Sequence, residues 1–179
     1  APGLKAINLD EGDRLIGTII TDGKDEVCLA SRSGKAIRFK ETDVRPMGRS
    51  TRGVKGMNIN KEDKVISIIK VNPDSNLLTL SENGYGKRTN ISEFGGQKRG
   101  GKGVIALNTS DRNGMMVAAV QVLDGDEVML IGNKGTLIRT QVDQISVIGR
   151  NTQGVKVVST REDEKLVDAV GFKESLDEE

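Results

Sequence analysis

The sequence predicts an all-β protein built as a propeller-like array of four-stranded blades. Two observations support this: the sequence repeats about every fifty residues, and each period contains four strand-like runs. One segment recurs four times, at intervals of 50, 50 and 51 residues. Its copies are Gly3–Leu9, Gly53–Ile59, Gly103–Thr109 and Gly154–Thr160. About three complete periods are too few to close a ring, so we expect part of a larger array.

The first period illustrates the four runs. We expect strands over Arg14–Thr21, Glu26–Ser31, Lys35–Lys40 and Val54–Ile59, separated by Asp-Gly and Ser-Gly turn signals. The second run and its equivalents, residues 77–80 and 128–131, are almost wholly apolar, which is typical of strands buried on both faces. The third run alternates polar and apolar residues and should lie nearer a sheet edge. No segment has a convincing helical period.

The repeat also divides the chain into successive units. The first copy of the recurring segment would be the last strand of a preceding blade, and residues 165–171 the first strand of a following one. The expected units are residues 1–11 as the end of a preceding blade, 12–60, 61–111 and 112–161 as blades, 162–173 as a closing strand and 174–179 as an acidic tail.

The composition argues against most enzyme classes. The chain has no histidine and one cysteine, Cys28, so it lacks the usual zinc ligands and any Ser-His or Cys-His nucleophile pair. We expect no metal site, and a thiol that is buried and inert. Only three Phe and one Tyr are present, too few for the stacking surfaces that bind single-stranded nucleic acid. If the partner is a nucleic acid, it should be a duplex.

The small net charge of +1 conceals an asymmetry. Residues 161–179 carry three Lys or Arg against eight Asp or Glu, whereas residues 1–160 carry 24 against 18. A basic body therefore carries an acidic end, which is most often solvated but can compete with a polyanion. There is no apolar run long enough to span a membrane and no signal segment at the start, so we expect a soluble, cytoplasmic protein.

Basic residues concentrate in the segments that link the third and fourth strands of each period. These segments are Val44–Lys55, Phe94–Val104 and Val147–Lys156. Because they are equivalent in the repeat, we expect them to line one curved rim that binds the phosphates of duplex DNA. Outside the glycine-rich segment, the rim cations are Arg45, Arg49, Arg52, Lys55, Arg150 and Lys156; Arg49 and Arg150 occupy the same repeat position as Arg99.

The second of these segments is rich in glycine and nearly matches a nucleotide-binding P-loop. From Gly96 it follows the pattern G-x-x-x-x-G-K, but Gly103 stands where a P-loop has the Ser or Thr that holds magnesium. The residues that follow, 104–107, are predicted to form a strand rather than the required helix. A nucleotide-binding enzyme is therefore disfavoured, although glycines interspersed with cations still suit a phosphate ligand.

The same segment carries the motif of a known family. The chain resembles, over essentially its whole length, the C-terminal domain of the A subunit of bacterial DNA gyrase. The family's most specific motif, the GyrA-box Q-R-R-G-G-K-G, is matched at six of seven positions by residues 97–103, read as QKRGGKG. The exception is Lys98, which keeps the charge of an arginine but loses its planar fork. The box residues are Gln97, Lys98, Arg99, Gly100, Gly101, Lys102 and Gly103.

The resemblance implies a fold and a function. The fold is a β-pinwheel whose neighbouring blades exchange strands. It wraps duplex DNA around its basic perimeter, so that the ATP-driven enzyme introduces negative supercoils. In such a protein the box cations would brace the wrap, and Gly100, Gly101 and Gly103 would give backbone access to phosphate. The partners would be DNA, the remainder of the gyrase A subunit and the gyrase B subunit, close to the bacterial nucleoid.

The resemblance further implies that this chain has no catalytic site or cofactor of its own, because ATP and Mg²⁺ act elsewhere in the holoenzyme. Tyr85 lies between two glycines, without the neighbours that strand cleavage requires, and should be structural. Two alternatives stay open. One is the related domain of the topoisomerase IV A subunit, which usually lacks an intact box. The other is a protein-interaction propeller, which should present apolar hot spots on its rim.

Overall fold

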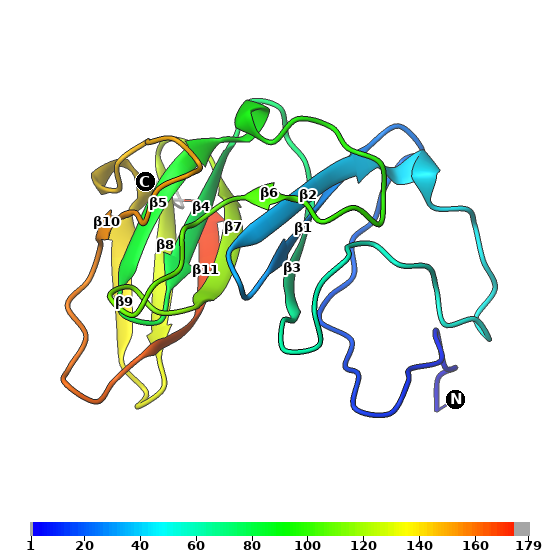
Figure 1. Ribbon diagram of the computed structural model, residues 1–179, viewed down its shortest axis with the longest axis horizontal. Coiled ribbons are helices and arrows are strands. Elements are labelled where there is room, and N and C mark those ends of the chain that lie inside the picture. Colours follow the sequence, from blue (N-terminus) through cyan, green and yellow to red (C-terminus); the bar gives the residue numbers. More distant parts are fainter. Residues whose placement is uncertain (1, 174–179) are drawn as a thin grey trace, which may run out of the picture.

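The computed structural model describes residues 2–173, which fold into antiparallel sheets that pack one after another (Figure 1). All regular structure in these residues is strand apart from short 3-10 turns, which confirms the all-β class. The strands are β1 (Glu26–Ser31), β2 (Lys35–Lys40), β3 (Val65–Lys70), β4 (Asn76–Ser81), β5 (Tyr85–Asn90), β6 (Val104–Ile105), β7 (Met116–Val122), β8 (Asp126–Gly132), β9 (Leu137–Gln141), β10 (Val155–Lys156) and β11 (Leu166–Lys173). The 3-10 turns are η1 (Glu41–Asp43), η2 (Ile91–Glu93) and η3 (Val142–Gln144).

Each sheet combines strands from two successive sequence periods. In the first sheet, β1 and β2 form a hairpin, while β3 and β6 of the next period pair with β1 and β2. In the second sheet, β7 and β10 join the hairpin β4-β5 in the same way. The third sheet, in the described residues, has three strands in the order β11-β8-β9. Neighbouring blades therefore exchange strands, and each sheet crosses one of the period boundaries expected near residues 60, 111 and 161.

Strand exchange explains which sequence predictions succeeded. The runs Glu26–Ser31 and Lys35–Lys40 form β1 and β2 with the predicted bounds. The predictions of strands at Arg14–Thr21 and Val54–Ile59 were wrong, because neither segment forms a strand. A first strand pairs with the second strand of the preceding period, and a fourth strand with its third. Residues 2–173 contain no such partner for either segment, and Ile20 remains 91% exposed.

The central strands of the sheets supply the core. Cys28 of β1 and Leu77 of β4 belong to one buried cluster that joins the first two sheets. Leu78 of β4 and Val128 of β8 belong to a second cluster that joins the second and third sheets. The cysteine is fully buried as predicted, and this burial raises the pKa of its thiol to about 12. The predicted acidic tail, residues 174–179, lies outside the described residues.

The 3-10 turns position the rim segments. η1, η2 and η3 recur at the repeat period, and each lies between a third strand and the linking segment that follows it. The sequence did not predict them, because three residues are too few to show a helical period. No helix in the described part of the chain has the length and apolar character needed to cross a membrane.

Candidate nucleic-acid interface

The box segment lies along the side of β2 that faces away from β1. After η2 the chain turns back beside the first sheet, where Gly96 forms a parallel bridge with Arg38 and the Gln97 amide donates to the Arg38 carbonyl at 2.7 Å. The segment ends as β6, which pairs with the start of β2 (Figure 1). The box is therefore an outer border of the sheet rather than a loop at its tip. The two-residue strand β6 follows the box directly, so the helix that a P-loop requires is not formed.

The third-period segment has the same geometry on the second sheet. Val147 forms a parallel bridge with Arg88, and the Ile148 amide donates to the Arg88 carbonyl at 2.9 Å. The segment ends as β10, which pairs with the start of β5. Equivalent basic segments thus border neighbouring sheets, which is the arrangement a continuous rim requires.

The cations of the box have different environments. Lys98 and Lys102 are exposed. Arg99 is partly buried, and its guanidinium donates from Nε to the Asp43 carbonyl at 3.0 Å and from Nη1 to the Lys55 carbonyl. These acceptors flank the first-period basic segment. Arg99 therefore fastens that segment to the box, whereas the two lysines are available to solvent.

Arg150 repeats the contact of Arg99 one period later. Its Nη1 donates at 3.2 Å to the carbonyl of Ile105, which occupies the same repeat position as Lys55. Both arginines thus bind the backbone of the preceding period.

The other sequence-predicted cations are exposed. Arg52 pairs with exposed Asp10 at 3.0 Å, and Lys156 Nζ donates to the Asn83 carbonyl at 2.9 Å. The exposed cations of the first-period segment are Arg45, Arg49, Arg52 and Lys55.

We expect the Arg99→Lys substitution to loosen the first-period basic segment. Lysine keeps the charge, but its single terminal nitrogen cannot stand at the two separate positions from which Nε and Nη1 of Arg99 reach the carbonyls of Asp43 and Lys55. The loss should be about 1–2 kcal/mol of unfolding free energy, with faster amide hydrogen exchange across residues 44–55. Lys98→Ala is the matched control, because this exposed lysine lies beside Arg99 in the box. Equal exchange in both variants would contradict the fastening role.

Two of the three box glycines have structural reasons of their own. Gly103 has a φ of +71°, and a Cβ there would lie 2.5 Å from the Ala36 carbonyl oxygen of β2. Gly100 has a φ of +82°, and its amide donates to the Gly56 carbonyl at 2.8 Å. A Cβ on Gly101 would lie 3.4 Å from Ile37 Cδ1. The close approach to β2 thus accounts for Gly103 and the positive φ for Gly100, whereas the contact at Gly101 is an ordinary van der Waals one.

Tyr85 is held between two cations. The Arg112 guanidinium lies 4.9 Å and Lys156 Nζ 4.8 Å from the centroid of its ring. Its hydroxyl accepts from Arg112 Nε at 3.4 Å, and this contact lowers the pKa of the phenol. The contacts agree with the structural role expected for this residue.

Sequence reasoning missed a buried lysine beneath the third-period segment. Lys87 of β5 is fully buried, and its Nζ donates to the carbonyls of Gly149, at 2.7 Å, and Arg150. Burial lowers the pKa of this ammonium group to about 8. Its repeat equivalents are Ile37 and Ile138, so a lysine at an otherwise apolar position was the signal in the sequence.

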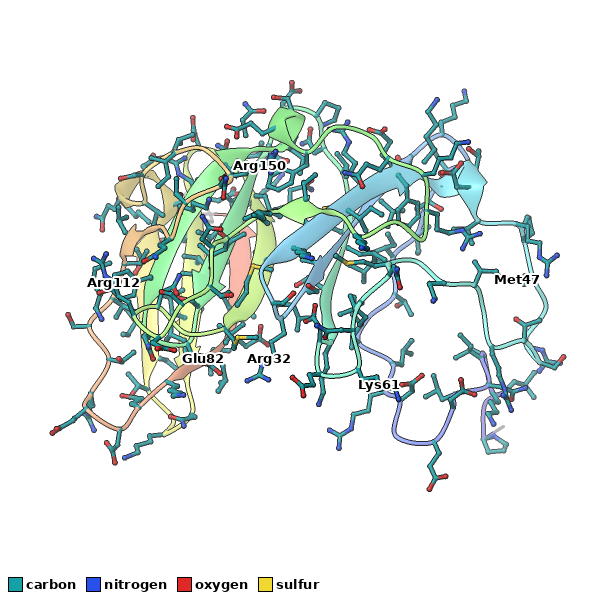
Figure 2. The ribbon with its side chains drawn as sticks, viewed as in Figure 1. Arg32, Met47, Lys61, Glu82, Arg112 and Arg150 are labelled. Carbon is teal, nitrogen blue, oxygen red and sulfur yellow. The ribbon has the colours of Figure 1, made fainter. Side chains whose placement is uncertain are left out.

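A second missed residue, Glu82, joins neighbouring sheets. Its carboxylate lies 3.2 Å from Nη2 of Arg32 (Figure 2). It also lies 3.7 Å from Lys165 Nζ and accepts from the Met115 amide at 3.1 Å. Burial opposes ionisation, but the hydrogen bonds from Met115 and Arg32 outweigh it and lower the pKa of Glu82. This cluster therefore links the ends of strands from successive periods.

The repeat that shapes the rim is also the repeat of a known family. The family model for the DNA gyrase C-terminal domain, described as a beta-propeller, matches residues 3–22, 25–72, 75–122 and 126–170. The chain belongs to the DNA gyrase C-terminal domain family. The matched units follow one another at the spacing of the sequence periods.

Relatives of this gyrase-family chain are similar along almost all of it. The DNA gyrase A subunit of Escherichia coli strain K12 is 49% identical over 177 residues, which is 99% of this chain and 20% of that protein. The DNA gyrase A subunit of Pseudomonas aeruginosa is 53% identical over 165 residues, which is 92% of this chain and 18% of that protein. The chain therefore spans about a fifth of the length of these relatives.

Solved structures agree with the family assignment. A DNA gyrase A C-terminal domain superposes with a TM-score of 0.87 at 31% identity, covering 95% of this chain and 58% of the other. The C-terminal domain of a DNA topoisomerase IV superposes with a TM-score of 0.88 at 26% identity, covering 94% and 53%. The fold is thus shared by gyrase and topoisomerase IV domains.

Proposed function

We propose that this chain binds duplex DNA along its basic rim and bends it into a wrap, as the C-terminal domain of the gyrase A subunit. The observation that carries the proposal is the equivalent placement of the box and the third-period segment along the borders of neighbouring sheets. In this proposal exposed cations such as Lys98 and Lys102 follow one another along a curved path. A path of this kind suits the phosphate backbone, which carries no sequence information.

The energetics of a wrap are compatible with such a rim. Smooth bending of a site of two or three helical turns costs about 1–6 kcal/mol. Each cation that neutralises a phosphate releases condensed counterions, which favours binding at low salt. Several rim contacts can therefore offset the bending cost, and a curved surface makes more of them when the DNA follows it.

The chain acts in this proposal as a non-catalytic part of a type II topoisomerase. Its partners are duplex DNA, the remainder of the gyrase A subunit and the gyrase B subunit. ATP hydrolysis, which uses Mg²⁺, and strand cleavage belong to those other parts, and the wrap presents a DNA segment for passage so that the holoenzyme introduces negative supercoils. This function would place the protein at the bacterial nucleoid.

The test is duplex-DNA affinity measured against salt concentration. With about four phosphate contacts, the plot of log affinity against log salt should have a slope of roughly −3.6. Replacing Lys98 and Lys102 by alanine should flatten it by about 1.8, and adding Arg99→Ala should lower affinity further by releasing the first-period segment. The control is the double substitution of Lys61 and Lys64, exposed lysines in the turn before β3. A shallow slope that none of these changes alters would favour a protein-interaction propeller.

A topoisomerase IV domain is the second candidate, because the superposition on such a domain is as good as that on gyrase. The six matched box positions favour gyrase. The holoenzyme that contains this chain should introduce negative supercoils into relaxed plasmid when ATP is present. Relaxation and decatenation without negative supercoiling would assign the chain to topoisomerase IV.

A further inference from the structure

We propose that the segment Gly149–Asn151 is a second phosphate-binding site, shaped from beneath by Lys87 and occupied by the Glu93 carboxylate when DNA is absent. The ligand is a backbone phosphodiester of duplex DNA. The inference rests on the proposed function, because it assigns a further contact to the same rim.

Lys87 fixes the direction of two successive peptide groups. Its Nζ binds the carbonyls of Gly149 and Arg150, so both oxygens point inward. In a planar trans peptide the N–H points away from the C=O. The amides of Arg150 and Asn151 therefore face away from the lysine, towards the rim. Successive outward N–H groups form a concave site that prefers anions.

An anion already occupies this place. Oε2 of Glu93 accepts from the Arg150 amide at 3.0 Å, and the same oxygen lies 3.8 Å from where a Cβ on Gly149 would stand. Glu93 is exposed, so its carboxylate is held here by the segment rather than by burial. The carboxylate thus takes the place of a phosphate oxygen.

The first sheet lacks this arrangement. Asp43, the repeat equivalent of Glu93, contacts the box through its backbone carbonyl, which accepts from Arg99 Nε at 3.0 Å. The residue equivalent to Lys87 is Ile37, whose Cδ1 packs beneath Gly101. The box therefore has exposed lysines without an internal anion, whereas the third-period site has a buried lysine and a carboxylate that competes with DNA.

The charges around the site decide when it binds. Lys87 lies beneath the site, Arg150 beside it and Glu93 on it. Burial lowers the pKa of Lys87, the Glu93 carboxylate raises it and Arg150 lowers it further. A phosphate that displaces Glu93 restores a negative charge at the same place. Displacement costs affinity, so this site should engage only after the box has anchored the duplex and raised its local concentration.

The test compares Glu93→Gln with Asp43→Asn, which removes the same charge from the equivalent position. Duplex-DNA affinity is measured from low to moderate KCl. Glu93→Gln should raise affinity about tenfold at low salt and make the salt slope steeper by about 0.9, because one more phosphate contact forms. Asp43→Asn should raise affinity less and leave the slope unchanged. Backbone NMR signals of Arg150 and Asn151 should shift on DNA addition more in Glu93→Gln than in Asp43→Asn.

Each outcome separates the two proposals. Absence of salt-dependent DNA binding by the unaltered protein would overturn the proposed function itself. A steep slope in the unaltered protein, with Glu93→Gln and Asp43→Asn behaving alike, would overturn the second phosphate site and leave the proposed function standing. Unshifted Arg150 and Asn151 amides in DNA-saturated Glu93→Gln would also overturn the site.

Discussion

Replacing Gly84 by alanine is expected to lower the free energy of unfolding by about 4 kcal/mol. Gly84 has a φ of +80°, a conformation that costs a residue with a Cβ about 1–2 kcal/mol. The new Cβ would also lie 2.2 Å from the Val158 carbonyl oxygen, and such overpacking costs about 1–3 kcal/mol. The segment after β10 would have to move, although its Val157 and Val158 amides both bind the Gly84 carbonyl. Urea unfolding followed by far-ultraviolet circular dichroism would measure the loss.

The repeat supplies a control for this prediction. Gly135 is the equivalent turn glycine of the third period, with a φ of +85°, but a Cβ there would meet nothing within 4 Å. Gly135→Ala should therefore lose only the conformational part, about 1–2 kcal/mol. Gly34, where a Cβ would lie 2.1 Å from the Leu107 oxygen, should behave like Gly84. Equal losses at Gly84 and Gly135 would show that the close contact with the segment after β10 contributes nothing to the loss of stability.

These glycines illustrate what sequence can predict in this fold. The turns and the runs that became β1 and β2 are local patterns, so their bounds were predictable. The partner of each strand was not, because pairing joins residues a whole period apart. Residues 14–21 have the composition of a strand, yet form none without a partner in the described residues. Strand exchange itself was available only from the resemblance to a known family.

The equivalent placement of the rim segments was predictable, but the contacts of their side chains were not. The repeat placed the box and the third-period segment on one rim, and the structure has them along equivalent sheet borders. A sequence shows the charge of an arginine but not which groups accept its hydrogen bonds. It could therefore not show that Arg99 and Arg150 bind backbone carbonyls of the preceding period. Lys87 could have been found, because it replaces an isoleucine of the repeat.

That lysine is expected to make stability depend on pH. In the native state the pKa of Lys87 is about 8, while its ordinary value is about 10.4. Between these two values the unfolded chain holds a proton that the native chain has released, so stability rises as pH increases from 8 to 10.4. The gain should reach at most about 3 kcal/mol. The gain is absent below pH 8, where Lys87 is protonated in both states and its buried charge destabilises the native state.

The Lys87→Met variant isolates this effect, because methionine fills a similar volume without a titrating group. The unfolding free energy of the unaltered protein minus that of Lys87→Met should increase between pH 8 and 10.4, while the contributions of other lysines and of Tyr85 cancel. The same subtraction for Lys35→Met, an exposed lysine at the start of β2, should stay flat. A flat difference for Lys87 as well would mean that water reaches its ammonium group beneath the third-period segment, so that the pKa is not lowered by burial. Water could then bind the carbonyls of Gly149 and Arg150 in place of Nζ. In that case Lys87 would not be what turns these carbonyls inward and the amides of the proposed phosphate site outward.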